Sequence, residues 1–194
     1  MNTGKKTLNR YILSQVKKDL DYQKSVLILG PRQVGKSTLI KDLLSQDYHF
    51  DSILLQNPEN RIRFEQDPSR LIKDYEVAGT NNLIYLDEVQ KVSELFDSIQ
   101  YLIEEKKKIF ILTGSSARKL RRKQVNMLPG RIILSHLDPL MWGEMGMLKG
   151  AFIPELKMEN INPKLPYSWE DCLIYGTLPE MVMTVEEERK RILK

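Results

Sequence analysis

The chain has 194 residues, and its hydrophobic fraction of 41% suits a packed core and excludes a disordered or fibrous protein. Lys and Arg number 30 against 26 Asp and Glu; the net charge of +4 suits a polyphosphate ligand without requiring nucleic acid. Cys172 is the only cysteine, which excludes a disulfide framework and a cysteine-built zinc site. No apolar run approaches the roughly 18 residues of a membrane span, so we expect a cytoplasmic protein with no membrane partner.

Short apolar segments alternate with amphipathic segments through most of the chain. Helices are predicted at 8–20 and at 36–45. Two short helices should follow, the first beginning at Pro58 and the second after Asp67-Pro68. A further helix is predicted from the N-cap Ser93 to about residue 106. Strands are predicted at 26–29, within 50–55, and at 83–86, 109–112 and 132–134. Strands that are apolar throughout are typical of a parallel sheet covered by helices on both faces. The pattern therefore predicts an α/β domain.

The segment after the first predicted strand carries a phosphate-binding motif. Gly30, Gly35, Lys36 and Ser37 have the P-loop spacing G-x-x-x-x-G-K-[ST]. The glycines let backbone N–H groups approach phosphate oxygens, and the following helix adds its positive dipole end. Lys36 is expected to contact the β- and γ-phosphates of ATP, and the Ser37 hydroxyl to bind Mg²⁺. The nucleotide-binding residues predicted here are Gly30, Pro31, Arg32, Gln33, Val34, Gly35, Lys36, Ser37 and Thr38.

The strand at 83–86 ends in two adjacent carboxylates, Asp87 and Glu88, which is the form of a Walker B motif. Because parallel strands end at one edge of a sheet, both residues should lie near the P-loop. Asp87 is expected to hold Mg²⁺ together with Ser37, directly or through water. Successive strand residues point in different directions, so Glu88 is expected to orient and polarise the attacking water. We therefore predict that Glu88 and Lys36 are catalytic.

Hydroxyl side chains follow the predicted strand at 109–112. In one interpretation, Thr113 and Ser115 bond the attacking water or the γ-phosphate and belong to the nucleotide site. In the other, Ser115 or Ser116 only caps a helix predicted at 117–122. The residues themselves leave both interpretations open.

Cations follow in two places. Arg131 stands directly before the strand at 132–134. In one interpretation it is an arginine finger that contacts the γ-phosphate of a nucleotide in its own or in a neighbouring subunit. In the other it is a solvent-exposed residue at the start of a strand. Earlier in the chain, a run without acidic residues consists of Arg118, Lys119, Arg121, Arg122 and Lys123. Such a run is usually a solvated face, but it could contact nucleic-acid phosphates or act as a lid. No aromatic residue is interleaved, so base stacking has no support.

The alternation ends at Asp138-Pro139, and glycines and prolines then mark an irregular connection. A short helix is predicted at 169–175 with Ser168 as its cap, followed by a last helix at the chain end. A helix without a packing partner is marginal alone, so we interpret the chain as cut within a second domain. The predicted division is a nucleotide-binding domain at 1–145, then a linker and the beginning of a C-terminal domain at 146–194.

Five segments occur in an order that resembles a known family: Gly30–Ser37, Asp87-Glu88-Val89-Gln90, Leu112–Ser116, Gly130-Arg131 and Leu137-Asp138-Pro139-Leu140. They are similar to a large group of prokaryotic AAA-type P-loop ATPases, mostly uncharacterised, in which a C-terminal domain of unknown function follows the nucleotide domain. The likeness covers roughly residues 8–145. It implies a three-layer P-loop NTPase with a parallel five-stranded sheet of order 5-1-4-3-2, but no particular substrate.

Three hypotheses follow for the function. The main one is an ATPase that binds Mg²⁺ with ATP or ADP and uses hydrolysis to move the C-terminal domain or a partner. If Arg131 acts on a neighbouring subunit, this ATPase would work as a homo-oligomer. The second is a nucleotide-gated module that binds DNA or a protein and has little activity. The third is a P-loop kinase with Arg118, Arg121 and Arg122 as a lid. Glu88 directly after Asp87 favours water activation over the kinase.

Overall fold

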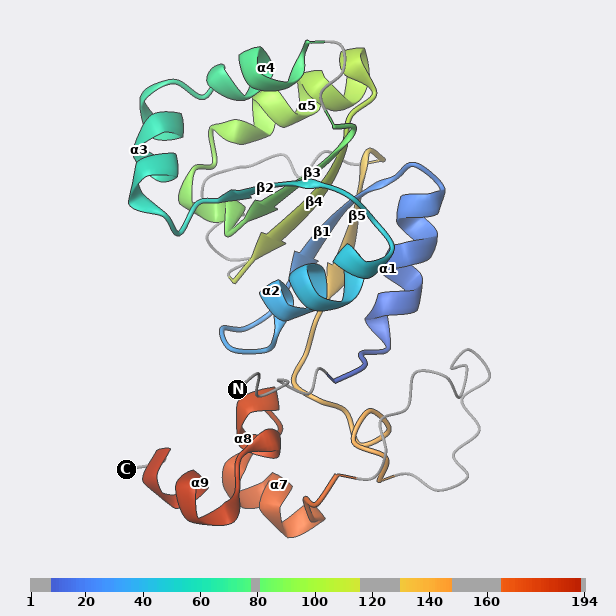
Figure 1. Ribbon diagram of the computed structural model, residues 1–194, viewed down its shortest axis with the longest axis vertical. Helices are drawn as coiled ribbons and strands as arrows, with labels where there is room; N and C mark the ends of the chain where they lie inside the picture. Colours follow the sequence, from blue (N-terminus) through green and yellow to red (C-terminus); the bar gives the residue numbers. More distant parts are fainter. Residues whose placement is uncertain (1–7, 78–80, 116–129, 148–164, 193–194) are drawn as a thin grey trace.

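The computed structural model describes residues 8–77, 81–115, 130–147 and 165–192. Its centre is a five-stranded sheet in the order β2-β3-β4-β1-β5, in which all neighbouring strands are parallel (Figure 1). The strands are β1 (Ser25–Leu29), β2 (Asp51–Leu54), β3 (Leu83–Asp87), β4 (Ile109–Gly114) and β5 (Ile132–His136). From the opposite edge this order is 5-1-4-3-2, so the predicted α/β architecture is confirmed.

The central strand β4 and its neighbour β1 are buried along their whole length. Leu29 at the end of β1 is paired with Gly114 of β4 and with His136 of β5. Because all strands run the same way, the segments that leave β1, β3 and β4 emerge at one edge of the sheet. The candidate functional residues that follow these strands are therefore brought to the same edge.

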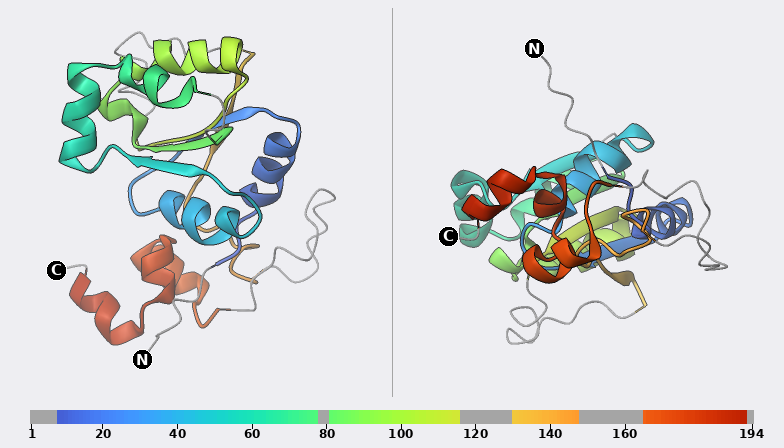
Figure 2. Two further views of the ribbon diagram at one scale, coloured as in Figure 1. Left: turned by 45° about the horizontal axis from the view of Figure 1, so that its top comes forward. Right: turned by 90° about the horizontal axis from the view of Figure 1, so that it is seen from below.

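Helices cover both faces of the sheet and give three layers (Figures 1 and 2). The helical elements around the sheet are α1 (Ile12–Asp21), α2 (Lys36–Thr38), its π-helical and 3-10 continuations η1 (Leu39–Leu43) and η2 (Leu44–Gln46), α3 (Pro58–Gln66), α4 (Arg70–Tyr75), the 3-10 turn η3 (Val89–Lys91) and α5 (Leu95–Lys106). One apolar cluster includes Phe64 of α3, Leu71 of α4 and Phe96 of α5, whereas the other includes Val16 of α1 and Leu39 of η1. Burial of both faces explains why the strands are apolar throughout.

The first helix is shorter than the periodicity predicts. α1 begins at Ile12, and the preceding residues from Leu8 to Arg10 are not helical. Leu8 packs into a cluster of the C-terminal region, and the guanidinium of Arg10 is bonded to groups outside the helix. Tertiary contacts therefore override the helical spacing here.

The start of α5 also differs from the prediction. Glu94 occupies the N-cap position before Leu95, and the Ser93 hydroxyl donates to the Glu94 carboxylate at 3.2 Å instead of capping the helix. The two helices on either side of Asp67-Pro68 are present as predicted, as α3 and α4. The helix predicted at 117–122, with the cation run and Ser116, lies outside the described residues.

The C-terminal region contains three short helices, α7 (Trp169–Tyr175), α8 (Pro179–Met183) and α9 (Glu186–Ile192). Ser168 caps α7 through a capping box with Asp171, which confirms the predicted cap. A third apolar cluster joins this region to the chain before α1 and after β5; its buried members are Leu8, Leu140, Met145, Leu165, Tyr167 and Val182. In Figures 1 and 2 these helices lie at the end of the sheet where the loop before α2 is found.

The last helix, α9, has a packing partner, contrary to the prediction. Arg189 is only 4% exposed, and its Nε donates to the backbone oxygen of Met181 at 3.0 Å. Its guanidinium carbon lies 4.4 Å from the centroid of the Tyr167 ring, and Nη1 lies 3.7 Å from an Asp171 carboxylate oxygen. One buried arginine therefore anchors α9.

Within the described ranges, no helix combines the length and apolarity needed to cross a bilayer.

Candidate nucleotide-binding site

The loop between β1 and α2 has a backbone conformation that depends on its glycines. Gly35 has a φ of 97° and Gln33 a φ of 64°, so the chain enters the left-handed region twice within three residues. A Cβ on Gly30 would lie 2.2 Å from the backbone oxygen of Leu137, so only glycine fits there. The curled loop is of the kind whose N–H groups can converge on an anion.

The remaining side chains of the predicted loop divide by exposure. Pro31, Arg32 and Gln33 are exposed, and so is Thr38 at the end of α2. Val34 is completely buried in the apolar cluster beside α1. Val34 therefore anchors the loop to the core, and its contribution to a ligand would come from the backbone.

Lys36 is buried beneath this loop, with 6% of its surface exposed. Its Nζ donates to the backbone oxygens of Gly30 and Pro31, each at 2.8 Å, and lies 4.0 Å from a carboxylate oxygen of Glu88. Burial lowers the pKa of Lys36, while the charges of Glu88 and Asp87 raise it. The ammonium group is thus desolvated and held between the loop and the end of β3.

Asp87 and Ser37, the two predicted metal ligands, both lie near the Tyr85 hydroxyl. The Asp87 carboxylate is 4% exposed; it accepts from Thr113 Oγ1 at 2.6 Å and from Gln56 Nε2 at 3.3 Å. Tyr85, two residues earlier on the same face of β3, is fully buried. Burial and the Asp87 charge raise the pKa of Tyr85, and the nearby hydroxyls of Thr113 and Ser37 act in the opposite direction; the Tyr85 hydroxyl itself has no hydrogen-bond partner among the described residues. Ser37 and Asp87 therefore lie beside the same phenol group.

These donors fit Mg²⁺. The ion prefers oxygen ligands and is usually held by one or two protein oxygens together with substrate phosphates and water. Ser37 supplies a hydroxyl and Asp87 a carboxylate at the edge of the sheet where the P-loop emerges. Within the described part of the chain, no group of three or more His, Cys, Asp or Glu side chains is arranged to hold a metal by itself. Two protein oxygens of this kind fit an ion that completes its coordination with phosphate oxygens and water.

Glu88 follows Asp87 in a left-handed conformation, with a φ of 58° and 9% exposure. One carboxylate oxygen accepts hydrogen bonds from Ser115 Oγ at 2.7 Å and from Gln90 Nε2, which also donates to Ser115 Oγ at 3.0 Å. The Glu88 backbone N–H donates to Thr113 Oγ1 at 3.2 Å. The structure thus brings Asp87, Glu88, Thr113 and Ser115 together at one edge of the sheet.

Arg131 lies at the other end of the sheet. It precedes Ile132, which is paired with Ser25 at the start of β1, whereas the P-loop follows the end of β1. The five residues of β1 separate the two edges by about 16 Å. The Arg131 side chain is 45% exposed and forms an ion pair with Glu104 of α5. This position excludes an action of Arg131 on a nucleotide of its own subunit, and an action on a neighbouring subunit stays a prediction.

Two residues at this edge were missed by the sequence patterns. Gln90 hydrogen-bonds to both Glu88 and Ser115; it belongs to the segment Asp87–Gln90 that resembles the family, but the pattern assigned it no role. Arg10 is 5% exposed and donates from Nη1 to the backbone oxygen of Val34 at 2.9 Å. Its only signal was a charge near the start of an amphipathic segment, directly after Asn9. Both depend on contacts that no local periodicity encodes.

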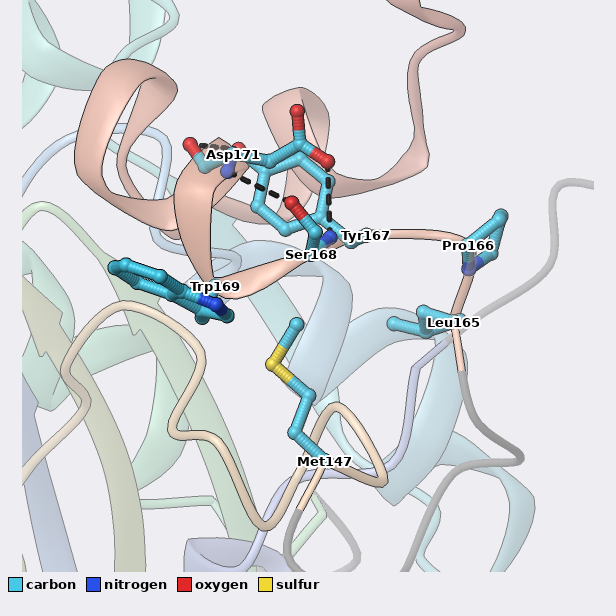
Figure 3. A pocket seen from close by; sticks show the side chains of 7 residues that line it. All are labelled: Met147, Leu165, Pro166, Tyr167, Ser168, Trp169 and Asp171. Carbon is cyan, nitrogen blue, oxygen red and sulfur yellow. Dashed lines mark hydrogen bonds between the residues drawn. The ribbon is translucent and has the colours of Figure 1, made fainter.

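A pocket of about 590 Å³ opens in the C-terminal region (Figure 3). It is lined by Met147, Leu165, Pro166, Tyr167, Ser168, Trp169 and Asp171. Figure 3 shows that Ser168 and Asp171 bond each other in the cap of α7, so their polar groups are already partnered. No residue of the P-loop, Asp87 or Glu88 lines this pocket, and it is not part of the candidate nucleotide site.

Comparison with known proteins identifies the family of the chain and supports its fold. None of the curated proteins matches the chain. A Walker-type ATPase of Pyrococcus abyssi has a similar structure, with a TM-score of 0.55 and 17% identity over 88% of this chain and 64% of that one. The replication initiator DnaA bound to AMPPCP and single-stranded DNA has a TM-score of 0.54 and 16% identity over 97% and 62%. This chain spans less than two thirds of either structure.

At such identities the two structures establish the fold alone. The family model described as an AAA domain matches residues 22–146, which is more than half of the chain. The matched range contains the P-loop, the carboxylates that end β3 and the hydroxyls that end β4. The chain therefore belongs to the AAA-type P-loop ATPase family.

Proposed function

We propose that this chain binds Mg·ATP at the loop between β1 and α2 and hydrolyses it to ADP and phosphate. The observation that carries the proposal is the convergence of Lys36, Asp87 and Glu88 on one edge of the sheet, with Ser37 near the same Tyr85 hydroxyl as Asp87. The DnaA structure of similar fold holds the nucleotide analogue AMPPCP, which agrees with a nucleotide in this site.

Each of these side chains has a role in the proposal. Lys36 exchanges the carbonyl oxygens of the loop for oxygens of the β- and γ-phosphates. Ser37 and Asp87 would hold Mg²⁺, which supplies charge neutralisation on those phosphates. Glu88 takes a proton from a water whose oxygen bonds to the γ-phosphorus as the bond to the β–γ bridging oxygen breaks. Ser115 orients the Glu88 carboxylate through its hydrogen bond.

The proposal extends to the organisation of the chain. We take 1–145 as the AAA-type domain and 146–194 as a linker and the beginning of a C-terminal domain, in a cytoplasmic protein. Pro179 of α8 lies 3.8 Å from the position of a Cβ on Gly35, which supports a mechanical link between the two parts. Hydrolysis would then move the C-terminal region or a partner bound to it.

A nucleotide-gated module that binds DNA is the second candidate. It is supported by the fold shared with DnaA, whose structure also contains single-stranded DNA. Both candidates require nucleotide binding, and they differ in whether turnover occurs without DNA.

Phosphate release by the chain separates the two. The assay uses Mg·ATP with and without single-stranded DNA, alongside direct ATP titration. Turnover without DNA supports the ATPase. ATP binding without turnover, combined with DNA affinity that changes when ATP is added, supports the module. If neither ATP nor ADP binds, both candidates fail.

We expect Asp87→Asn to weaken Mg²⁺-dependent ATP binding by about tenfold or more, because the amide keeps the shape but loses the charge that faces the ion. Titration with a fluorescent ATP analogue in Mg²⁺ and in EDTA measures this, and only the Mg²⁺ affinity should change. Asp97→Asn, the same substitution at an exposed position of α5, is the matched control. Equal Mg²⁺ affinities for the two variants would contradict a metal role for Asp87.

If Arg131 acts on a neighbouring subunit, specific activity should rise with protein concentration, because the finger is present only in assemblies. Arg131→Ala should then lower turnover by about tenfold or more where part of the protein is assembled, and leave ATP affinity unchanged. Rates across a hundredfold dilution series, with exposed Arg70→Ala as the control, test this. A flat concentration profile with a silent Arg131→Ala would show that Arg131 is an ordinary residue before a strand.

A further inference from the structure

Arg10 lies in the extended segment before α1 and is buried behind the P-loop. Three of its donors have acceptors in three different segments. Nη1 donates to the backbone oxygen of Val34 in the loop at 2.9 Å, and Nη2 to that of Asp138 after β5 at 2.5 Å. Nε donates to a carboxylate oxygen of Glu144 at 3.1 Å. One planar guanidinium therefore fixes the relative positions of the loop, the exit from β5 and the turn at 141–147.

Glu144 holds the guanidinium in this place. It is 1% exposed, and its carboxylate also accepts from the backbone N–H groups of Tyr11 at 2.7 Å and Met141 at 3.0 Å. A buried ion pair contributes little net stability, because desolvation offsets the attraction between the charges. The pair is better explained by the position that it imposes on its neighbours than by stability alone.

The bond from Arg10 to Val34 has a consequence for the inside of the loop. A trans peptide is planar, so the C=O of Val34 and the N–H of Gly35 point in opposite directions. A donor that holds the Val34 oxygen on the outer side of the loop therefore turns the Gly35 N–H to the inner side. Gly35 has a φ of 97°, in the left-handed region that glycine adopts readily, so this peptide can rotate if the oxygen is released.

We propose that Arg10 is a positioning residue for the phosphate-binding loop: it fixes the Val34–Gly35 peptide so that the Gly35 N–H faces the bound phosphate. This inference rests on the proposed nucleotide site and adds a residue that is remote from it in sequence. Arg10 does not touch the phosphate, and it acts through the carbonyl of Val34.

Calorimetric titration with Mg·ADP tests the proposal. Arg10→Met, which keeps the length and removes every donor, should lower the affinity at least tenfold. Arg10→Lys keeps the charge beside Glu144 but loses the planar set of guanidinium donors, so its affinity for Mg·ADP should lie between those of Arg10→Met and the parent. Lys108→Met is the matched control, because Lys108 is 7% exposed and bonds Asn81 O and Asn82 Oδ1 at the amino end of β4, the opposite edge of the sheet. It should reduce thermal stability and leave the affinity within twofold.

A second readout uses the protein without nucleotide. Arg32 is exposed in the loop, so trypsin cleavage between Arg32 and Gln33 in the folded protein reports opening of the loop. Arg10→Met should raise the rate of this cleavage at least fivefold relative to cleavage after exposed Lys24, and Lys108→Met should not.

The two readouts separate failure of this inference from failure of the proposed function. If the parent binds Mg·ADP and Arg10→Met binds it within twofold as tightly, the positioning role is overturned and the nucleotide site stands. If the parent does not bind Mg·ADP, the proposed function fails, and the rate of cleavage after Arg32 then tests the positioning role of Arg10. An equal rate in the parent and in Arg10→Met would overturn that role. If Arg10→Met does not fold, Arg10→Lys replaces it in both measurements, and parent-like values overturn the role.

Discussion

Lys36→Ala is expected to lower the affinity for Mg·ATP by at least about a hundredfold. The ammonium group of Lys36 makes two hydrogen bonds to loop carbonyl oxygens, and it can transfer both to phosphate oxygens. Hydrogen bonds to charged groups contribute about 1.5–3 kcal/mol each. A bond to a charged phosphate oxygen is stronger than the bond to a neutral carbonyl oxygen that it replaces, and a difference of about 1.4 kcal/mol for each of the two bonds corresponds to roughly a hundredfold in affinity. Equilibrium titration with a fluorescent ATP analogue measures the change.

Lys41→Ala is the control for this prediction. Lys41 lies on η1, a few residues further along the same helical segment, and its side chain is exposed. The control should bind ATP as tightly as the parent. An affinity for Lys36→Ala within threefold of the parent, about 0.6 kcal/mol, would remove the basis for a phosphate site at this loop.

Glu88→Gln is expected to retain ATP binding within about threefold but to lower turnover by about 10²–10⁴-fold, the usual contribution of a positioned general base. The amide oxygen can still accept hydrogen bonds from Ser115 and Gln90, so the local arrangement should persist. The amide cannot take a proton from water. Single-turnover phosphate release from preformed complexes measures the chemical step separately from binding.

The matched control is Glu105→Gln, an exposed position near the end of α5. Its turnover should equal that of the parent. If Glu88→Gln also hydrolyses ATP at the parent rate, Glu88 is only a polar residue that ends a strand, and the water must be activated in another way.

The elements of the site that could be predicted are those whose geometry is local. The P-loop requires two glycines, a lysine and a hydroxyl within eight positions, and the adjacent carboxylates Asp87 and Glu88 stand at the end of a buried strand. A parallel sheet then brings these two segments to one edge without further information. The order of the strands could not be predicted in this way. The alternation of apolar and amphipathic segments predicts only a parallel α/β sheet, and the order 5-1-4-3-2 was implied by the family resemblance.

Residues that act through distant partners could not be predicted in this way. Arg10 is separated from Glu144 by 134 positions, so no window along the chain contains both. Arg189 anchors α9 through groups of α7 and α8, which an apolar pattern does not reveal. Arg131 was a different case, because it directly precedes a strand. A residue before a parallel strand lies at the amino edge of the sheet, so its distance from the P-loop of its own subunit was deducible from its position alone.

The close approach of Gly30 to the chain after β5 has an evolutionary consequence. A Cβ there would meet the backbone oxygen of Leu137 at 2.2 Å and Val34 Cγ1 at 3.2 Å, so a side chain would force two segments of the fold apart. Selection for folding alone retains this glycine, whatever the loop binds. In a pseudoenzyme descended from such a chain, Lys36 and Ser37 would drift while Gly30 stayed invariant. Conservation of Gly30 in a set of homologues would therefore reflect the close packing of these two segments, whereas conservation of Lys36 and Ser37 would reflect the ligand.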